Sequence, residues 1–254
     1  LNFAKTKQEP LDVVRERSGN ALRQSARGTG NYDLTGYEKR LLWKIAAASE
    51  KREWTAVSSH FAEYSGDAPP LFAAAMHGAL RCSRYKEGAK IYDKCRASSQ
   101  VLHGPVYTAA IKLFGKLGAP SRVREVWDEA LQVVGVNEIL GSARITAAAD
   151  EGNVSAAAEV LDLMNASGVT IHVGHVASAI RACWGWGTNQ HKPARYIFNL
   201  LPEFGLMPNV IIFTNLIRAY ATAPVKDTVA LYQDMKALQI KPNRVFAEIY
   251  LTTI

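Results

Sequence analysis

Basic side chains recur along this chain at a nearly constant spacing, four residues after a row of small side chains. The first row, whose members lie 34 to 37 residues apart, is His77, Lys112, Thr146, Arg181 and Arg218. The second row is Ala73, Thr108, Ser142, Ala177 and Thr214. On a helix, residues four apart share one face. A face with a basic edge and a small polar floor suits single-stranded nucleic acid, whose phosphates bind cations and whose bases bind small polar groups.

Solvation is the alternative explanation for the basic row, because charged residues are common on exposed helix faces. The formal net charge of +7 is compatible with an anionic partner but does not require one. The sequence leaves both interpretations open.

Catalytic patterns are absent from the sequence. It contains no P-loop, no HExxH, no GxSxG and no His-Glu motif with paired cysteines like that of zinc deaminases. The three cysteines, Cys82, Cys95 and Cys183, lack the spacing of a zinc site. We therefore expect a protein that is not an enzyme and that needs neither cofactor nor metal.

The two rows belong to an internal repeat, which is typical of helical solenoids. Residues 1–34 form a polar, basic extension ahead of the array. The array occupies 35–254, with repeats at 35–68, 69–103, 104–137, 138–172, 173–209 and 210–243, and a partial seventh at 244–254.

Each repeat has the apolar pattern of two amphipathic helices. Val160, Leu161 and Met164 illustrate the spacing in the second half of a repeat, and Phe213, Ile217 and Tyr220 that in the first half. Neither helix covers its apolar face alone, so stacking on the next pair is expected to complete the core. The joint at 205–209 has a glycine to end one helix, a proline, and an asparagine to cap the next. An all-α fold follows.

At these joints the chain resembles the pentatricopeptide-repeat family. The similarity lies in the opening at 213–217 and in the Pro-Asn endings at 208–209 and 242–243. Tetratricopeptide repeats share the helix-pair plan, but their tryptophan and glycine-tyrosine signature is absent. The resemblance implies a right-handed α-solenoid of about six repeats plus a partial seventh. It also implies RNA binding in an organelle, either the mitochondrion or, alternatively, the plastid.

In this family the fifth and last residues of a repeat together select one base. Carried over by position, the pairs are Ala73/His103, Thr108/Asn137, Ser142/His172, Ala177/Asn209 and Thr214/Asn243. The resemblance assigns adenine to the two Thr/Asn pairs, which are not adjacent. Helix capping is an alternative role for Asn137, Asn209 and Asn243, with a value of about 1 kcal/mol each. The resemblance therefore implies weak selectivity.

Two hypotheses remain for the partner. In the first, the inner face holds single-stranded RNA through Lys112, Arg181 and Arg218, with Thr108, Ser142 and Thr214 facing the bases. In the second, the protein is a scaffold subunit of a large organellar assembly such as a mitochondrial ribosome. That scaffold would bind other proteins through the apolar residues of the partial repeat, Val245, Phe246, Ile249 and Leu251. No apolar run approaches the length of a membrane span, so none is predicted.

Overall fold

A computed structural model of the chain describes residues 34–98, 102–184 and 190–254. The predicted extension at 1–34 lies almost wholly outside these residues. The described chain is all-α, with thirteen α-helices, one short 3-10 helix and no strand. It divides into two compact units, one ending at Gly135 and the other beginning at Val136. We call them the N-terminal and C-terminal units and describe each by itself.

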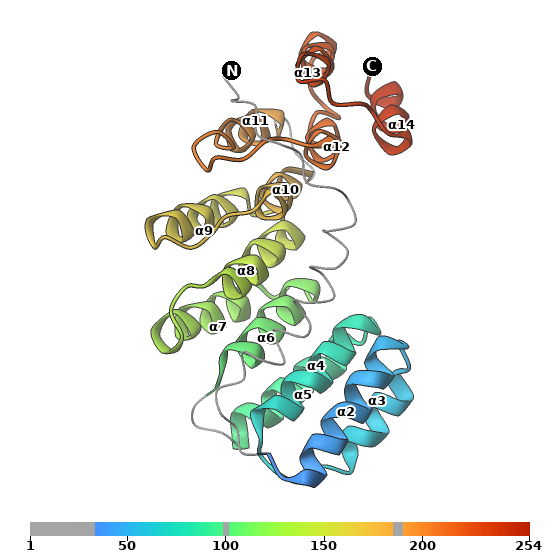
Figure 1. Cartoon of the computed structure of the whole chain (residues 1–254), viewed down its shortest axis with the longest axis vertical. Helices are drawn as coiled ribbons and strands as arrows, with labels where there is room; N and C mark the ends of the chain where they lie inside the picture. Colours follow the sequence, from blue (N-terminus) through green and yellow to red (C-terminus); the bar gives the residue numbers. More distant parts are fainter. Residues whose placement is uncertain (1–33, 99–101, 185–189) are drawn as a thin grey trace. The chain divides into compact units, whose positions relative to one another are not determined.

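The N-terminal unit contains three antiparallel helix pairs (Figure 1). Its helices are α2 (Gly36–Glu50), α3 (Trp54–Ala62), α4 (Pro69–Arg81), α5 (Tyr85–Ser98), α6 (Gly104–Lys116) and α7 (Pro120–Val133). We call α2, α4 and α6 first helices and the others second helices. The starts of α4 and α6 coincide with the first residues of predicted repeats.

The C-terminal unit continues the same plan. Its helices are α8 (Glu138–Glu151), α9 (Val154–Ala166), α10 (Val173–Arg181), η1 (Ala182–Trp184), α11 (His191–Asn199), α12 (Val210–Ala219), α13 (Val225–Ala237) and α14 (Arg244–Thr253). Here the first helices are α8, α10, α12 and α14. All four begin at the first residue of a predicted repeat.

Within each unit the first helices pack directly on one another and form a continuous layer. In the N-terminal unit α4 contacts both α2 and α6, and in the C-terminal unit α10 contacts α8 and α12, which in turn contacts α14. Successive second helices in the described residues make no comparable contacts with one another. The first helices therefore form the more closely packed layer of each unit, which we call the inner layer, and the second helices form the more loosely packed outer layer.

Left-handed residues end the helices at regular places. Gly135, Gly168 and Gly205 have positive φ at the joints between repeats, and Gln239 has φ 57° in the same place. The Val169 N–H then donates back to the Met164 carbonyl of α9, which satisfies a carbonyl of the last helical turn. The predicted glycine role is thus confirmed at Gly168, with Gln239 in the same role after α13, whereas α11 ends at Asn199 and Gly205 follows in a separate turn.

The predicted apolar faces are buried almost completely. Val160, Leu161 and Met164 are buried on α9, as are Phe213, Ile217 and Tyr220 at α12. No helix in the described part of the chain is long and apolar enough to cross a membrane.

One expectation about the partial seventh repeat is wrong. Phe246 is buried, and its ring packs against those of Tyr232 and Tyr250, so it is not an open contact residue. Val245 and Leu251 on the same helix, α14, are exposed.

Candidate functional site

The two predicted rows lie on the first helices of both units. Counting from the start of each first helix, the small residues occupy position five and the basic row position nine. Position nine is half-buried in four repeats, whereas Arg218 is exposed. Within each unit, the structure thus places the residues of both rows on the inner layer. The environment differs from one cation to the next.

In the N-terminal unit the position-nine residues form a cationic cluster. Burial, together with the positive charges of Lys112 and Arg81, lowers the pKa of the His77 imidazole to about 4. Burial also lowers the pKa of the Lys112 ammonium. Among the described residues no carboxylate opposes either shift in pKa, so within this part of the chain the cluster has no acidic partner.

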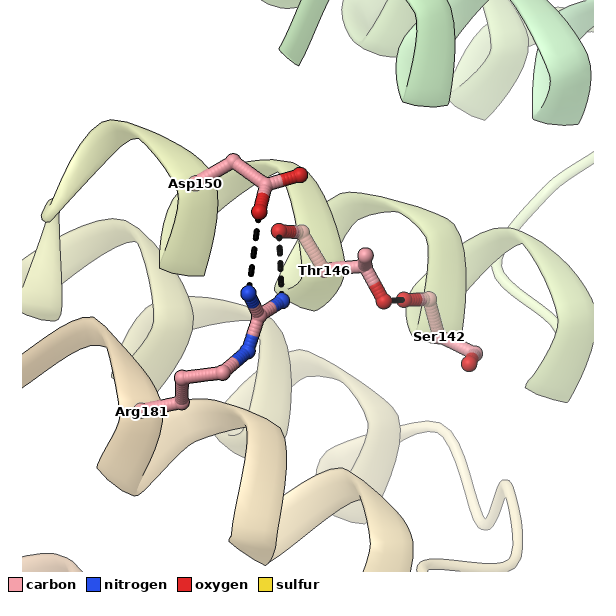
Figure 2. Close-up of polar contacts among 4 residues, drawn as sticks. All are labelled: Ser142, Thr146, Asp150 and Arg181. Atoms are coloured by element: carbon pink, nitrogen blue, oxygen red, sulfur yellow. Dashed lines mark hydrogen bonds and ion pairs between the residues drawn. The ribbon is translucent and has the colours of Figure 1, made fainter. Parts of the chain in front are cut away.

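In the C-terminal unit Arg181 is already paired. Its Nη1 lies 2.9 Å from the Asp150 carboxylate on α8, and its Nη2 donates to the Thr146 carbonyl at 3.4 Å. Figure 2 shows this guanidinium reaching from α10 back to α8. The negative charge of the Asp150 carboxylate offsets most of the positive charge of the Arg181 guanidinium.

Arg218 lies over an aromatic ring. Its guanidinium carbon is 4.6 Å from the ring centroid of Trp184, in the geometry of a cation–π contact. The Trp184 Nε1 donates to the Asn215 carbonyl at 2.9 Å, and the Asn215 amide donates to the Ala177 carbonyl at 3.0 Å. This network joins α12 to the preceding repeat and leaves the guanidinium exposed on a fixed platform.

The hydroxyls at position five are partly engaged by the backbone. Thr108 donates to the Gly104 carbonyl at 2.8 Å, and Thr214 donates to the Val210 carbonyl at 2.7 Å. Thr108 is only 4% exposed, whereas Ser142 and Thr214 are half-buried. Because these donors are used, the threonines offer a ligand only the acceptor lone pairs of the oxygen.

The last-position asparagines cap the helices that follow them. The Asn137 side chain accepts from the Leu140 N–H, that of Asn243 from the Phe246 N–H, and that of Asn209 from the N–H groups of Ile211 and Ile212. The capping role is therefore confirmed, and only the amide NH₂ of each asparagine is left for another partner.

The last-position histidine of the fourth repeat is tied to its neighbours. His172 Nε2 lies 3.4 Å from the Glu138 carboxylate, its ring stacks on that of His175, and its N–H donates to His175 Nδ1. This local network differs from the plain asparagine cap.

Sequence reasoning missed Asp150 and Arg81 and did not anticipate the stacking of Arg218 on Trp184. Asp150 follows Thr146 by one helical turn, so it lies on the same face of α8 as the predicted row. The sequence signal was an acidic residue, Asp150, one turn after position nine. Such a residue can pair with the position-nine arginine of the next repeat, here Arg181.

Comparison with known proteins identifies this fold. No family model matches the chain, and no curated protein matches it. Among solved structures, the chain is similar to the pentatricopeptide repeat protein PPR10 from maize, with 18% identity and a TM-score of 0.55 over 93% of this chain and 34% of that chain. It is also similar to two structures of PPR10 in complex with an 18-nt psaJ RNA element. For each of these, the identity is 15% and the TM-score 0.71, over 99% of this chain and 36% of that chain.

These similarities show that the chain is a helical-repeat protein with the fold of the pentatricopeptide-repeat proteins. The predicted solenoid fold is thereby confirmed. The chain spans about a third of the length of the PPR10 chains it matches.

Proposed function

We propose that this protein binds single-stranded RNA along the inner layer of first helices and catalyses no reaction on it. The observation that carries the proposal is the cluster of His77, Arg81 and Lys112. A half-buried ammonium without a carboxylate partner is costly in isolation, and a phosphate would supply the missing opposite charge.

The spacing of the row supports RNA over a small anion. Position nine is basic in four of the five repeats from 69 to 243, with Thr146 in the remaining one, and helical-repeat RNA binders of this kind hold about one base per repeat. The side chains at position five are small throughout, so they leave room for bases beside the cations. The PPR10 structures of the same fold contain RNA, which agrees with this assignment.

The hydrogen-bonding inventory supports weak sequence selectivity. At Thr214 and Asn243 the hydroxyl donor and one amide oxygen are used inside the protein. Fewer free donors and acceptors remain to distinguish one base from another. The proposed RNA is therefore held mainly through its phosphates and through base stacking.

Fluorescence anisotropy with a labelled RNA pool of about 20 nucleotides tests the proposal, since that length exceeds one base per repeat. Each phosphate neutralised adds about −0.7 to the log–log slope of affinity against salt. Lys112→Gln and Arg218→Gln should each reduce the steepness by about that amount. Arg181→Gln should have a smaller effect, because Asp150 already pairs with that arginine.

Arg124→Gln is the matched control, since Arg124 is an exposed arginine on the outer helix α7. Its removal should leave the slope unchanged. Absence of binding to any RNA in the pool at low salt would overturn the proposal.

A second candidate function rests on α14. Val245, Leu251 and Ile254 are exposed at the end of the C-terminal unit, and no second helix follows α14 in the described residues. A protein partner that covers them would make the chain a scaffold subunit of an organellar assembly. Leu251→Ser combined with Val245→Ser should then release co-purifying proteins without changing RNA affinity; unchanged co-purification would reject this role.

The proposed location is the mitochondrion, with the plastid as the alternative. The proposal extends from the RNA-binding assignment, because the family resemblance implies organellar RNA. Imaging of the tagged natural product against markers for the two organelles tests it, and an even cytosolic signal would contradict it.

A further inference from the structure

Helix α2 has a face that no other described helix covers and that combines cations with an aromatic ring. Trp43 is 72% exposed, although tryptophan normally covers most of its surface in a folded protein. Arg40 lies three residues before it and Lys44 one residue after it, and both are exposed. Lys39, one turn before Trp43, is exposed as well.

This face corresponds to the packing face of the other first helices in the N-terminal unit. The left-handed residues Arg52, Ser83 and Gly118 end the equivalent turns and fix the alignment. Counted back from them, Arg40 is equivalent to Leu71 and Val106, and Lys44 to Ala75 and Ala110.

All four of these equivalents are buried. Gly78, one turn after Ala75 on α4, lies on the same face. A Cβ added to Gly78 would come within 2.8 Å of Val57, which belongs to α3 of the preceding repeat, so this face of α4 packs on that repeat. In the described residues nothing packs on the same face of α2. Among the described first helices of this unit, α2 is thus the one that has cations where α4 and α6 have apolar residues.

We infer that this end face is a stacking platform for one nucleotide of a single-stranded RNA, with its base on the Trp43 indole and its phosphates beside Arg40 and Lys44. The inference rests on the proposed function, because the strand reaches α2 from the cationic cluster of α4 and α6 in the same unit. Base–aromatic stacking tolerates any sequence, since every base has a flat face.

Charge selects an anionic occupant. The residues one turn from Trp43 on α2 are Lys39, Arg40, Ala46 and Ala47, and none is acidic. The two carboxylates of α2 lie further away along the helix. Glu50 follows Trp43 by two turns, and Glu38 is engaged elsewhere: one oxygen accepts from the Tyr64 hydroxyl at 2.8 Å, and the other from the Thr35 backbone N–H at 2.9 Å. In the described residues no ion pair offsets the positive charge of Arg40 or Lys44. Electrostatic attraction therefore favours binding of a polyanion at this face.

The test compares two RNA lengths in the full chain. One strand has about six nucleotides and the other about twelve, chosen from one base per repeat and six repeats. Trp43→Ala should weaken binding of the longer strand about tenfold, a typical loss for one stacked base, and leave the Kd of the shorter strand unchanged. Trp43→Phe should restore most of the affinity, because a phenyl ring still stacks.

Charge and control variants accompany this comparison. The double change of Arg40→Gln and Lys44→Gln should reduce the steepness of the salt dependence by about 1.4, from about 0.7 per phosphate. Tyr196→Ala is the matched control, since Tyr196 is a 63% exposed aromatic on the outer helix α11. It should leave both strands unaffected.

Three results would overturn the inference in different ways. If the wild type binds RNA and Trp43→Ala binds the longer strand equally well, the platform is wrong and the proposed function stands. If the wild type binds neither strand at low salt, the proposed function falls and the platform with it. If acrylamide quenches the free wild type and Trp43→Phe alike, the Trp43 ring is not accessible in the free protein and the platform is wrong.

An acidic protein is the competing partner for this face. In that case RNA would leave the emission of Trp43 unchanged, whereas a stacked base should quench it. The difference spectrum between the wild type and Trp43→Phe isolates this one ring among the five tryptophans of the chain.

Discussion

Acidification should destabilise this protein through His77 well before most carboxylates titrate. In the folded chain the pKa of His77 is lowered from 6.5 to about 4, first by burial and then by Lys112 and Arg81. At pH values between these two pKa values, His77 is therefore protonated in the unfolded chain and neutral in the folded chain. The stabilising contribution is complete above pH 6.5 and is lost as the pH falls toward 4.

The magnitude follows from the two pKa values. Between pH 7.5 and pH 5 the difference in proton binding amounts to about 2 kcal/mol of unfolding free energy. That is a large share of the stability of a typical domain. Urea unfolding followed by circular dichroism at several pH values measures it.

His77→Gln isolates the effect, because glutamine keeps a polar side chain of similar reach but does not titrate. The variant and the wild type can differ in unfolding free energy at pH 7.5. The comparison therefore uses only the change in unfolding free energy of each protein between pH 7.5 and pH 5. Its stability should fall by about 2 kcal/mol less than that of the wild type on going to pH 5. Parallel curves for the two proteins would refute the buried, cation-flanked environment of His77. His175, whose pKa is also lowered by burial, is present in both proteins and cancels from the difference.

RNA provides a second readout of the same residue. A phosphate beside Lys112 would favour the protonated imidazole and raise the pKa of His77. Affinity of the wild type for RNA should then increase more steeply from pH 7.5 to pH 5 than that of His77→Gln. An equal pH dependence of affinity in both proteins would place the phosphates away from this cluster.

Three further predictions concern backbone and packing, all measured as unfolding free energies. Gln239→Gly should stabilise the chain by about 1 kcal/mol, because Gln239 has φ 57°, and Gly205→Gln should cost a similar amount at the matching joint; equal stabilities would refute the strain. Asn209→Ala should cost about 1 kcal/mol by removing the cap on two N–H groups, and a neutral result would contradict the capping role. Gly88→Ala should cost about 1–3 kcal/mol, since its Cβ would lie 2.6 Å from a Leu113 methyl, whereas Gly174→Ala, with open space around it, should not destabilise; the reverse order would be inconsistent with this packing.

Much of the fold could be predicted because it repeats. The glycines and asparagines found at several joints act through local backbone geometry, so Gly205 reveals a turn and Asn209 a helix start from sequence alone. The left-handed residues Arg52 and Ser83 could not be predicted, because sequence does not distinguish them from ordinary helical residues. Burial of Phe246 also escaped prediction, because it depends on Tyr232 from the preceding repeat.

The candidate site was predictable in position but not in charge state. A periodic row places Lys112 on a first helix of the N-terminal unit and Arg181 and Arg218 on first helices of the C-terminal unit, since position nine follows from the helix starts. Their chemistry depends on which residue of the preceding repeat each one meets.

That dependence gives the three cations different roles. Arg181 meets Asp150 and becomes part of the joint between α8 and α10, so its main contribution is to hold two first helices together. Arg218 meets an indole, which orients the guanidinium but leaves its charge uncompensated. Lys112 meets His77 and is left with excess positive charge in a half-buried place. Phosphate affinity should therefore follow the missing counter-charge and not the count of basic residues, with Lys112 and Arg218 contributing more than Arg181.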